Sequence, residues 1–421
     1  MDLRSRRRLS QARGAASTLA RRHKPDYWLV ILSALLMAIG LVVVYSISPA
    51  LSASQHISQS YFITKQLIAV VLGVIAFAFA ATTPVDFWKK IAKPLAIVAA
   101  VGCALVMVTP INAAYPAHRW IRLGGFSFQV AELVKLSLII WMAGFLTTRW
   151  QKGELGDSSA TLRPLLILLA GIGLVVARFQ SDLGSTGVMI VIMGSMAFTA
   201  GIPLKRIAMI GGLVGILLVL AISSSAYRRE RLATYLHPEK NCQTTGYQEC
   251  QALISVGSGG LFGLGLGNSV QAYGYLPEAS NDSIFAIIAE KLGFVGTVLI
   301  LAIYGVFISR LKFVIQRTAD QFSRLVVVGV MAWLSTQMII NVGAMTGLLP
   351  LKGITLPLIS QGGTSLIFLT AALGLVFQIS RYTSYKACEP ENSYGTTTTN
   401  SPDRRGIGRP YNAVTVTRPR T

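Results

Sequence analysis

The sequence has few charged residues and few of the side chains that bind metals. Only 13% of its 421 residues are charged, and it contains four cysteines and four histidines. The cysteines form no CxxC pair and the histidines form no HExxH motif, so the pattern does not support a structural zinc site or a zinc protease. Neither a Walker A loop nor a GxGxxG after a strand is present, so no nucleotide site is assigned.

Apolar residues are abundant instead. They make up 52% of the chain, and the mean hydropathy is +0.57. A soluble fold could not bury that much apolar surface, and a membrane helix needs about 20 apolar residues. We therefore expect an all-α polytopic membrane protein with ten transmembrane helices. The expected spans are 28–47, 66–81, 94–109, 133–146, 164–177, 183–200, 207–222, 284–308, 325–340 and 366–379.

The positive charges predict the orientation. The net charge is +21, and the Lys and Arg residues between alternate spans fall on one side. The positive-inside rule makes that side cytoplasmic, together with both termini. We expect a disordered basic arm at 1–26, a membrane domain at 27–381 with a large outer loop at 223–283, and a disordered tail at 382–421. For the arm, anionic lipid is favoured over nucleic acid as the partner.

Several cations depart from this rule. They fall on the expected outer side, where Lys and Arg should be sparse, and they are Arg119, Arg122, Arg178, Arg228, Arg229, Arg231, Lys240 and Lys352. Such a gathering favours an anionic ligand, for example a phosphate or pyrophosphate. The alternative is that long loops cross the membrane regardless of their charge. The charges alone leave both interpretations open.

Three ionisable residues lie at expected helix ends. Glu132 and Lys135 are spaced i, i+3 and share a helix face, so they form either a structural ion pair or part of a functional interior. Asp182 precedes an apolar run, and a helix N-cap is its simpler role.

The expected outer loop carries further candidates. Arg228, Arg229 and Arg231 suit a phosphorylated lipid head group, with a solvated helix as the alternative. Cys242 and Cys250 could close a short disulfide if this side is oxidising.

The stretch Tyr275–Glu290 reads YLPEASNDSIFAIIAE, a polar turn that leads directly into an apolar run. Asp282 stands just before that run, which is an ordinary position for an N-cap. Its other possible role is a general base at the membrane surface, with a pKa that desolvation raises toward neutrality.

Five passages resemble one protein family. They are RWIRLGGFSFQVAELVK (119–135), QSDLGST (180–186), YRRERLATYL (227–236), GLGNSVQAYGYLPEASNDSIFAIIAEKLG (265–293) and GLLPLKGITLPLISQGGTS (347–365). Their order and spacing resemble the SEDS family (shape, elongation, division and sporulation), which includes FtsW, RodA and SpoVE. The likeness runs from about residue 24 to 381. GLGNSVQ followed by YLPEA is more similar to the division (FtsW) branch than to the elongation (RodA) branch.

This resemblance implies ten transmembrane helices and a glycosyltransferase that polymerises peptidoglycan strands from lipid II. It implies that Asp282 is the essential acid. It makes further residues candidates for the substrate cavity, namely Arg119, Glu132, Lys135, Asp182, Lys352, Ser360 and Ser365, with Glu278 and Glu290 in support. Four motifs depart from the family pattern: QVAE, SND, QSDLG and SQGG. The SND departure puts the surroundings of Asp282 in doubt.

The resemblance also implies partners and a location. The partners would be lipid II, a glycan linked to undecaprenyl pyrophosphate, a class B penicillin-binding protein and other divisome membrane proteins. A divalent cation, Mg²⁺ or Mn²⁺, is a candidate cofactor. The expected place is the bacterial plasma membrane at the division septum. Alternative functions are a lipid II flippase, an elongation-type polymerase and a scaffold that only recruits a transpeptidase.

Overall fold

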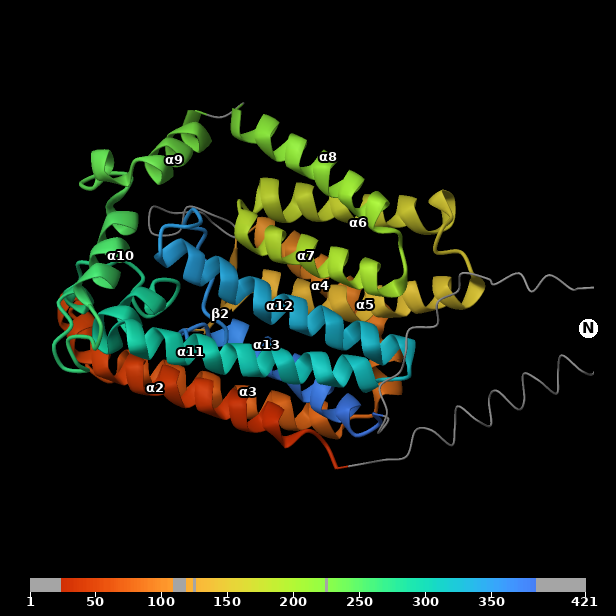
Figure 1. Ribbon diagram of the computed structural model, residues 1–421, viewed down its shortest axis with the longest axis horizontal. Helices are drawn as coiled ribbons and strands as arrows, with labels where there is room; N and C mark the ends of the chain where they lie inside the picture. Colours follow the sequence, from red (N-terminus) through yellow and green to blue (C-terminus); the bar gives the residue numbers. More distant parts are fainter. Residues whose placement is uncertain (1–23, 109–118, 124–125, 224–225, 384–421) are drawn as a thin grey trace, which may run out of the picture. The chain divides into compact units, whose positions relative to one another are not determined.

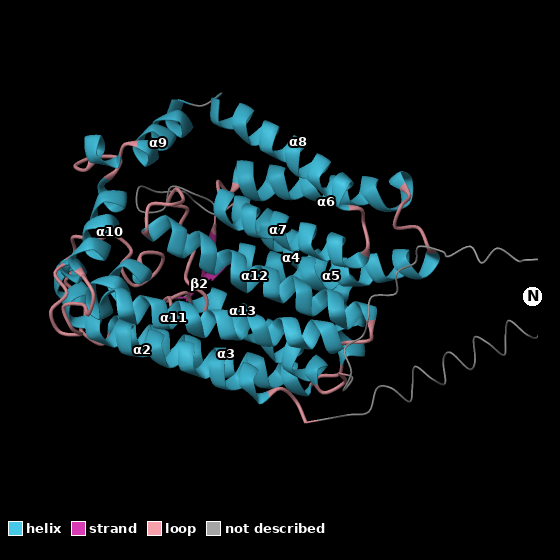
Figure 2. Ribbon diagram, in the orientation of Figure 1, coloured by secondary structure: helices cyan, strands magenta, loops and turns pink. Residues whose placement is uncertain are grey.

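The computed structural model describes residues 24–108, 119–123, 126–223 and 226–383. Most of the predicted basic arm and tail lies outside these residues. The described part is a bundle of long helices (Figures 1 and 2). The long helices are α2 (Tyr27–Gln55), α3 (Tyr61–Thr82), α4 (Val85–Met107), α5 (Val130–Lys152), α6 (Arg163–Ile172), α7 (Leu183–Ala200), α8 (Leu204–Ser223), α11 (Ile284–Arg317), α12 (Gln321–Met345) and α13 (Gly363–Ser380).

The expected membrane helices are present. Short π-helices η1 (Ser158–Leu162) and η2 (Gly173–Phe179) flank α6 and extend it to the length of a span. Nine helical segments within the described residues are long and apolar enough to cross a membrane, and α8 occupies the remaining expected span. The polytopic helical fold predicted from the sequence is confirmed.

Local signals in the sequence set several helix ends. The Asp320 side chain accepts a hydrogen bond from the Ser323 amide at 3.0 Å and caps the start of α12. α5 ends where Gly153 adopts a left-handed conformation, with φ of 72°. Such a C-terminal glycine satisfies the last carbonyls of a helix at no steric cost.

The centre of the bundle is formed by α5, α12 and α13. In their most apolar windows 72%, 61% and 78% of residues are buried, compared with 22% for both α3 and α4. α12 packs against α5, α7 and α11, whereas α13 packs against α3. The peripheral helices therefore present apolar side chains to the surrounding lipid, whereas the central helices are buried along most of their length.

Asp26 connects the helices α2, α11 and α13 through polar contacts. These contacts lie at the end of the bundle where the first and last described residues are found. The carboxylate of Asp26 pairs with Arg310 at 2.7 Å, and its amide donates to the Ser380 hydroxyl at 3.0 Å. Asp26 also caps α2. Asp26 thus contacts the helices directly at the predicted start of the membrane domain, and the predicted domain boundaries stay a prediction.

The segment between α8 and α11, expected as the large loop 223–283, is folded to a large extent. It contains α9 (Ala226–Leu236), the 3₁₀ turns η3 (Pro238–Asn241) and η4 (Gln271–Tyr273), and α10 (Tyr247–Ser258). In Figure 1 these elements form the green part at the left of the bundle. α10 packs against α11, so the segment is anchored to the helix that follows it.

A short hairpin adds to the expected all-α fold. Strands β1 (Trp120–Leu123) and β2 (Phe126–Gln129) pair antiparallel, with Trp120 opposite Gln129. Gln129 is also the N-cap residue of α5. The hairpin thus leads directly into the helix that carries Glu132 and Lys135.

Candidate functional site

The turn before α11 presents Asp282. Glu278 has a positive φ of 51°, and its carbonyl accepts hydrogen bonds from the amides of Asn281 (2.9 Å) and Ser283 (3.2 Å). The Asn281 side chain donates to the Glu278 carboxylate at 2.5 Å. This compact turn makes Ser283 the N-cap residue of α11, and the cap has no side-chain hydrogen bond. The predicted capping role of Asp282 is therefore wrong.

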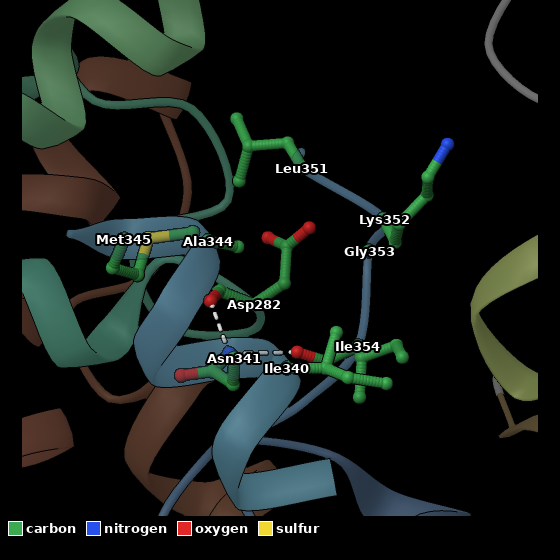
Figure 3. A pocket seen from close by; sticks show the side chains of 9 residues that line it. All are labelled: Asp282, Ile340, Asn341, Ala344, Met345, Leu351, Lys352, Gly353 and Ile354. Atoms are coloured by element: carbon green, nitrogen blue, oxygen red, sulfur yellow. Dashed lines mark hydrogen bonds between the residues drawn. The ribbon is translucent and has the colours of Figure 1, made fainter. Parts of the chain in front are cut away.

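The Asp282 side chain lines a pocket instead. The pocket is formed by Asp282, Ile340, Asn341, Ala344, Met345, Leu351, Lys352, Gly353 and Ile354. Figure 3 shows the carboxylate pointing away from Asn341 and toward the segment that carries Leu351, Lys352 and Gly353. Its Oδ1 atom is buried and has no hydrogen-bond partner within the described residues. An unpaired carboxylate oxygen in a pocket is available to accept a proton or to contact a ligand.

Asn341 holds the two walls of this pocket together. Its side-chain nitrogen donates to the backbone carbonyl of Asp282 at 2.6 Å and to that of Ile354 at 2.7 Å (Figure 3). Asn341 is 2% exposed and comes from α12. One buried amide therefore fixes the distance between the turn with Asp282 and the segment with Lys352.

Two further residues, Gln361 and Gln248, restrain the same turn. The Gln361 amide donates to the Ser280 carbonyl at 2.9 Å, and the Gln361 side chain donates to the Phe62 carbonyl at 2.7 Å. The Gln248 side chain, from α10, donates to the Ser283 hydroxyl at 3.1 Å. The glutamine in the SQGG departure thus has a structural role, since it connects the Asp282 turn to α3.

The surroundings of Asp282 shift its protonation equilibrium. Burial of the carboxyl group raises the pKa of Asp282 from 3.8 to about 7, and the negative charge of Glu278 adds to the increase. A carboxyl group with a pKa near neutrality can exchange a proton with a substrate hydroxyl at the working pH. The predicted increase in the pKa of Asp282 is confirmed.

Arg119 also lies close to Gly353. Its guanidinium donates to the carbonyls of Gln180 (3.1 Å) and Ser181. A Cβ atom on Gly353 would lie 3.6 Å from Asp282 Oδ2 and 4.0 Å from Arg119 Nη1. The base candidate and this cation therefore flank the same glycine, and a side chain there would intrude between them.

A second polar pocket adjoins the first. Lys135 pairs with Glu132 at 2.8 Å, and both side chains are buried. The Lys135 ammonium also lies 5.0 Å from the centre of the Trp333 ring, whereas Glu132 Oε2 has no partner within the described residues. Gly353 and Ile354 line both pockets, so one segment of chain separates them. The lining consists of Gln129, Glu132, Lys135, Ser185, Val188, Gln337, Gly353, Ile354 and Thr355.

Asp182 is confirmed as a helix cap. Its carboxylate accepts a hydrogen bond from the Ser185 amide at 2.9 Å at the start of α7. A Cβ atom on Gly184 would lie 2.8 Å from the Ile354 side chain. The cap thus packs closely against the segment between the two pockets, and a contact of Asp182 with substrate stays a prediction.

Other predicted residues make contacts away from the Asp282 carboxylate. Glu290 accepts hydrogen bonds from the Ser269 hydroxyl (2.5 Å) and the amides of Val270 (2.9 Å) and Gln271 (3.2 Å). The Ser360 hydroxyl accepts from the Leu356 amide at 2.7 Å, and the Ser365 hydroxyl lies 3.4 Å from that of Thr355. In this structure these side chains shape loops, and their predicted contact with substrate stays untested.

The structure tests the predicted disulfide of the outer loop but not the predicted anion binding by its arginines. Cys242 and Cys250 form the predicted disulfide, with Cα atoms 5.5 Å apart, so this prediction is confirmed. Arg229 is exposed on α9, whereas the side chains of Arg122, Arg178, Arg228 and Arg231 lie outside what the structure describes. Binding of an anion by these arginines stays a prediction.

Sequence reasoning missed Asn341 and Gln248, whereas Gln361 lies in the Ser360–Ser365 segment that the resemblance made a candidate. Asn341 did carry a signal, because an amide at the end of an apolar run is costly in a membrane unless it has partners. Gln248 lies in a polar segment, where nothing in the local pattern distinguishes it from a solvent-exposed residue.

Comparison with known proteins finds a matching family model and several relatives. The model of the FtsW/RodA/SpoVE family, described as cell cycle protein, matches residues 27–385. Stage V sporulation protein E of Bacillus subtilis is 36% identical over 368 residues, which cover 86% of this chain and 98% of that relative. A probable peptidoglycan glycosyltransferase FtsW of Thioalkalivibrio sulfidiphilus is 38% identical over 353 residues, with coverage of 83% and 87%.

Solved structures show the same fold. A chain of a peptidoglycan synthase complex, described as coordinating polymerization and crosslinking, matches with a TM-score of 0.69 and 27% identity. The match covers 85% of this chain and 98% of the other. The rod shape determining protein RodA of Thermus thermophilus matches with a TM-score of 0.62 and 27% identity, covering 86% and 98%.

Proposed function

The chain belongs to the FtsW/RodA/SpoVE family of cell cycle proteins, and from this premise we propose that it is a peptidoglycan glycosyltransferase of bacterial cell division. The observation that carries the proposal is the Asp282 carboxyl group, which has an unpaired buried oxygen and a pKa of about 7. It lies in a pocket where it can accept a proton from an incoming hydroxyl. The relatives named FtsW support the division role.

The proposed reaction joins two lipid-linked sugars. The 4-hydroxyl of an acceptor lipid II attacks the anomeric carbon of the donor strand, and its proton passes to Asp282. The new β-1,4 bond forms with inversion as the bond between the anomeric carbon and undecaprenyl pyrophosphate breaks. A general base typically contributes about 10²–10⁴-fold to such a step. Because both substrates carry lipid tails, they can reach the pocket sideways through the membrane.

Positive side chains near the pocket suit the departing pyrophosphate. Arg119 and Asp282 both lie near the position that a Cβ atom on Gly353 would occupy, and Lys352 lines the pocket itself. Cations that face developing phosphate charge lower the barrier to its departure. A divalent cation could add to this stabilisation, because the pocket offers the single carboxylate of Asp282. Mg²⁺ commonly binds one or two carboxylates together with substrate phosphates.

The proposed partner is a class B penicillin-binding protein that crosslinks the new strands. The similarity to a chain of a peptidoglycan synthase complex supports such a pairing. The proposed place is the plasma membrane at the septum, where other divisome membrane proteins would assemble with the pair.

Lipid II polymerisation by variants of the purified pair tests this function. We expect Asp282→Ala and Asp282→Asn to reduce glycan synthesis from labelled lipid II by about 10²–10⁴-fold, because both remove the base. Asp86→Asn is the matched control, since the Asp86 side chain is 81% exposed and pairs only loosely with Lys89 at 3.4 Å. Full synthesis by a folded Asp282→Ala protein would show that this carboxylate is not the base.

A vesicle assay separates the polymerase from the flippase. A polymerase joins lipid II supplied on the side of the membrane that Asp282 faces, and it does so without moving the lipid to the other leaflet. Movement of lipid II across vesicles that hold this chain, with no glycan product under any condition, would instead favour transport.

A further inference from the structure

The loop Gly259–Gly267, with the sequence GGLFGLGLG, lies against a break in α11. The break is at Gly293, whose φ of 65° and ψ of −167° are not helical. Four backbone hydrogen bonds join the loop to the broken helix. They run from the Leu264 amide to the Glu290 carbonyl (2.9 Å), from Gly265 to Lys291 (3.0 Å), from Phe294 to Gly260 (2.9 Å) and from Val295 to Leu261 (3.1 Å). We call residues 259–267 the inserted loop.

Glycine is required at three positions of this contact. A Cβ atom on Gly259 would collide with the carbonyl of Ala289, and one on Gly263 would collide with the carbonyl of Lys291. A Cβ atom on Gly293 would in turn collide with the amide of Gly263. The loop and the helix break therefore interlock backbone to backbone, with no room for side chains between them.

Two buried charged side chains complete the contact. The Lys291 ammonium donates to the carbonyl of Leu266, and the Glu290 carboxylate accepts from the amides of Val270 and Gln271 just beyond the loop. The polar groups that the helix break would leave unpaired thus find partners within the protein. Irregular backbone is tolerated at membrane depth when it is paired in this way.

The outward side of the inserted loop is apolar. Leu261 is 64% exposed, Phe262 80%, Leu264 39% and Leu266 43%. The backbone bonds place Leu261 beside Phe294 and Val295 of α11, which are 63% and 52% exposed. The exposed apolar side chains of the membrane helix are therefore joined by those of the loop.

The depth of the helix break follows from the charged cluster at the other end of α11. Arg310 and Asp26 form an ion pair, which marks the edge of the hydrocarbon layer because a charged pair is costly inside it. From Arg310 to Phe294 the helix rises over 16 residues (310 − 294), or about 24 Å at about 1.5 Å per residue. The hydrocarbon layer is about 30 Å thick, so the break lies inside its opposite edge.

We propose that the inserted loop is a re-entrant membrane anchor, with Leu261 and Phe262 packed among lipid acyl chains near the membrane surface on the Asp282 side. The occupant of this apolar face is the bilayer itself. The loop is hydrogen-bonded to α11 on both sides of Gly293. It therefore fixes the membrane depth of the short helical stretch Ile284–Leu292, which follows Asp282 in the chain. The Asp282 pocket would thereby be held at the level of the lipid head groups.

A depth measurement on the full chain tests this anchor. A cysteine at Phe262 is labelled with an environment-sensitive fluorophore in a Cys388→Ser background, since Cys103 is buried and Cys242 and Cys250 are paired. The labelled protein is placed in phosphatidylethanolamine/phosphatidylglycerol vesicles that contain lipids with a quencher on the acyl chain. Phe294→Cys is the lipid-facing reference, and Glu230→Cys, exposed on α9, is the water-facing reference.

We expect quenching at position 262 to match that at position 294 and to exceed that at position 230 several-fold. Quenching as weak as at position 230, with access for an aqueous quencher such as iodide, would overturn the proposal. Protection from both quenchers would also overturn it, because a second copy of the chain or a protein partner would then cover the loop. Phe262 is largely exposed, so its substitution should not disturb folding.

Discussion

The Asp282 carboxyl group couples the proposed reaction to pH. Burial, with help from the charge of Glu278, sets its pKa at about 7. A general base acts in its deprotonated form, so activity is lost as pH falls through the pKa of the base. We therefore expect kcat/KM for lipid II polymerisation to rise with pH and to level off above about pH 7.

Glu278→Gln supplies a matched variant for the pH profile. It removes the negative charge that opposes ionisation of Asp282, so the midpoint should move to lower pH. The shift should be a fraction of a pH unit, because Glu278 is exposed and water screens its charge. A midpoint that moves to higher pH, or a profile that is flat through neutrality, would contradict the role of this carboxyl group.

We expect Asn341 to affect catalysis by positioning the turn that carries Asp282. Asn341→Leu leaves the carbonyls of Asp282 and Ile354 without their donor, at a cost of about 1–3 kcal/mol for each buried group. The Asp282 turn should then move relative to Lys352, and small displacements can cost about 10²-fold in rate. We expect a decrease in kcat of about 10–100-fold with a smaller change in KM.

Two variants control this experiment. Met345→Leu changes another residue of the same pocket and conserves volume, so kcat should change little. Asn341→Asp keeps the shape but loses the donor, so its kcat should fall like that of Asn341→Leu. Wild-type kcat in both Asn341 variants would show that the contact does not position the base.

At this scale the sequence predicted the chemical type of the residues better than their contacts. Asp282 was expected as a possible cap because Asn281-Asp282-Ser283 precedes an apolar run. The structure gives the cap position to Ser283, since the positive φ of Glu278 closes a turn that no local pattern announces. Glu132 and Lys135 were correctly paired because a helix places i and i+3 on one face.

At the scale of elements, the broken helix α11 depends on three glycines. Gly263→Ala places a methyl group against the carbonyl of Lys291 at a φ of 80°, which a side chain rarely adopts. Backbone strain of this kind costs about 1–3 kcal/mol, and the collision adds to it. We expect a clear decrease in the thermal midpoint of unfolding in detergent.

Gly267→Ala is the matched control for this substitution. It lies in the same loop, but a Cβ atom there meets nothing within 4 Å. Its midpoint should stay close to that of the wild type. Equal stability of both variants would mean that the interlock with α11 does not stabilise the fold.

The sequence predicted the positions of the membrane helices, but it did not predict the break in α11 at Gly293. The apolar run 284–308 predicted one continuous span, whereas α11 runs to Arg317 and is interrupted at Gly293. A single glycine within an apolar run does not reveal a break, because the partner backbone lies about thirty residues earlier in the chain. Likewise WIRL and FSFQ are each only four residues long, too short for a strand pattern to be recognised, so the hairpin was missed.

At the scale of the whole molecule, the order and number of helices followed from hydropathy, because each membrane span must satisfy its own backbone. The two pockets could not be predicted from hydropathy, because they depend on which helices pack together. Asn341 of α12 reaches the Asp282 turn and the Ile354 segment only in the assembled bundle. The two polar pockets therefore belong to the tertiary fold, and no single motif contains them.

The orientation in the membrane is the remaining prediction at this scale. Positive charges predict that the end of the bundle with Asp282 faces outward and that both termini are cytoplasmic. Ser58, in the exposed connection between α2 and α3, should then be outside, and Lys205, at the start of α8, should be inside. The disulfide between Cys242 and Cys250 agrees, since disulfides persist on the oxidising side.

Labelling of single cysteines in intact cells checks this orientation. In a Cys388→Ser background, Ser58→Cys should react with a membrane-impermeant maleimide added outside, whereas Lys205→Cys should react only after the cells are permeabilised. Both positions are exposed, so a lack of reaction would reflect the membrane and not burial. The reverse pattern would place Asp282 in the cytoplasm, where it could not meet substrate in the outer leaflet, and the proposed site of polymerisation would then be wrong.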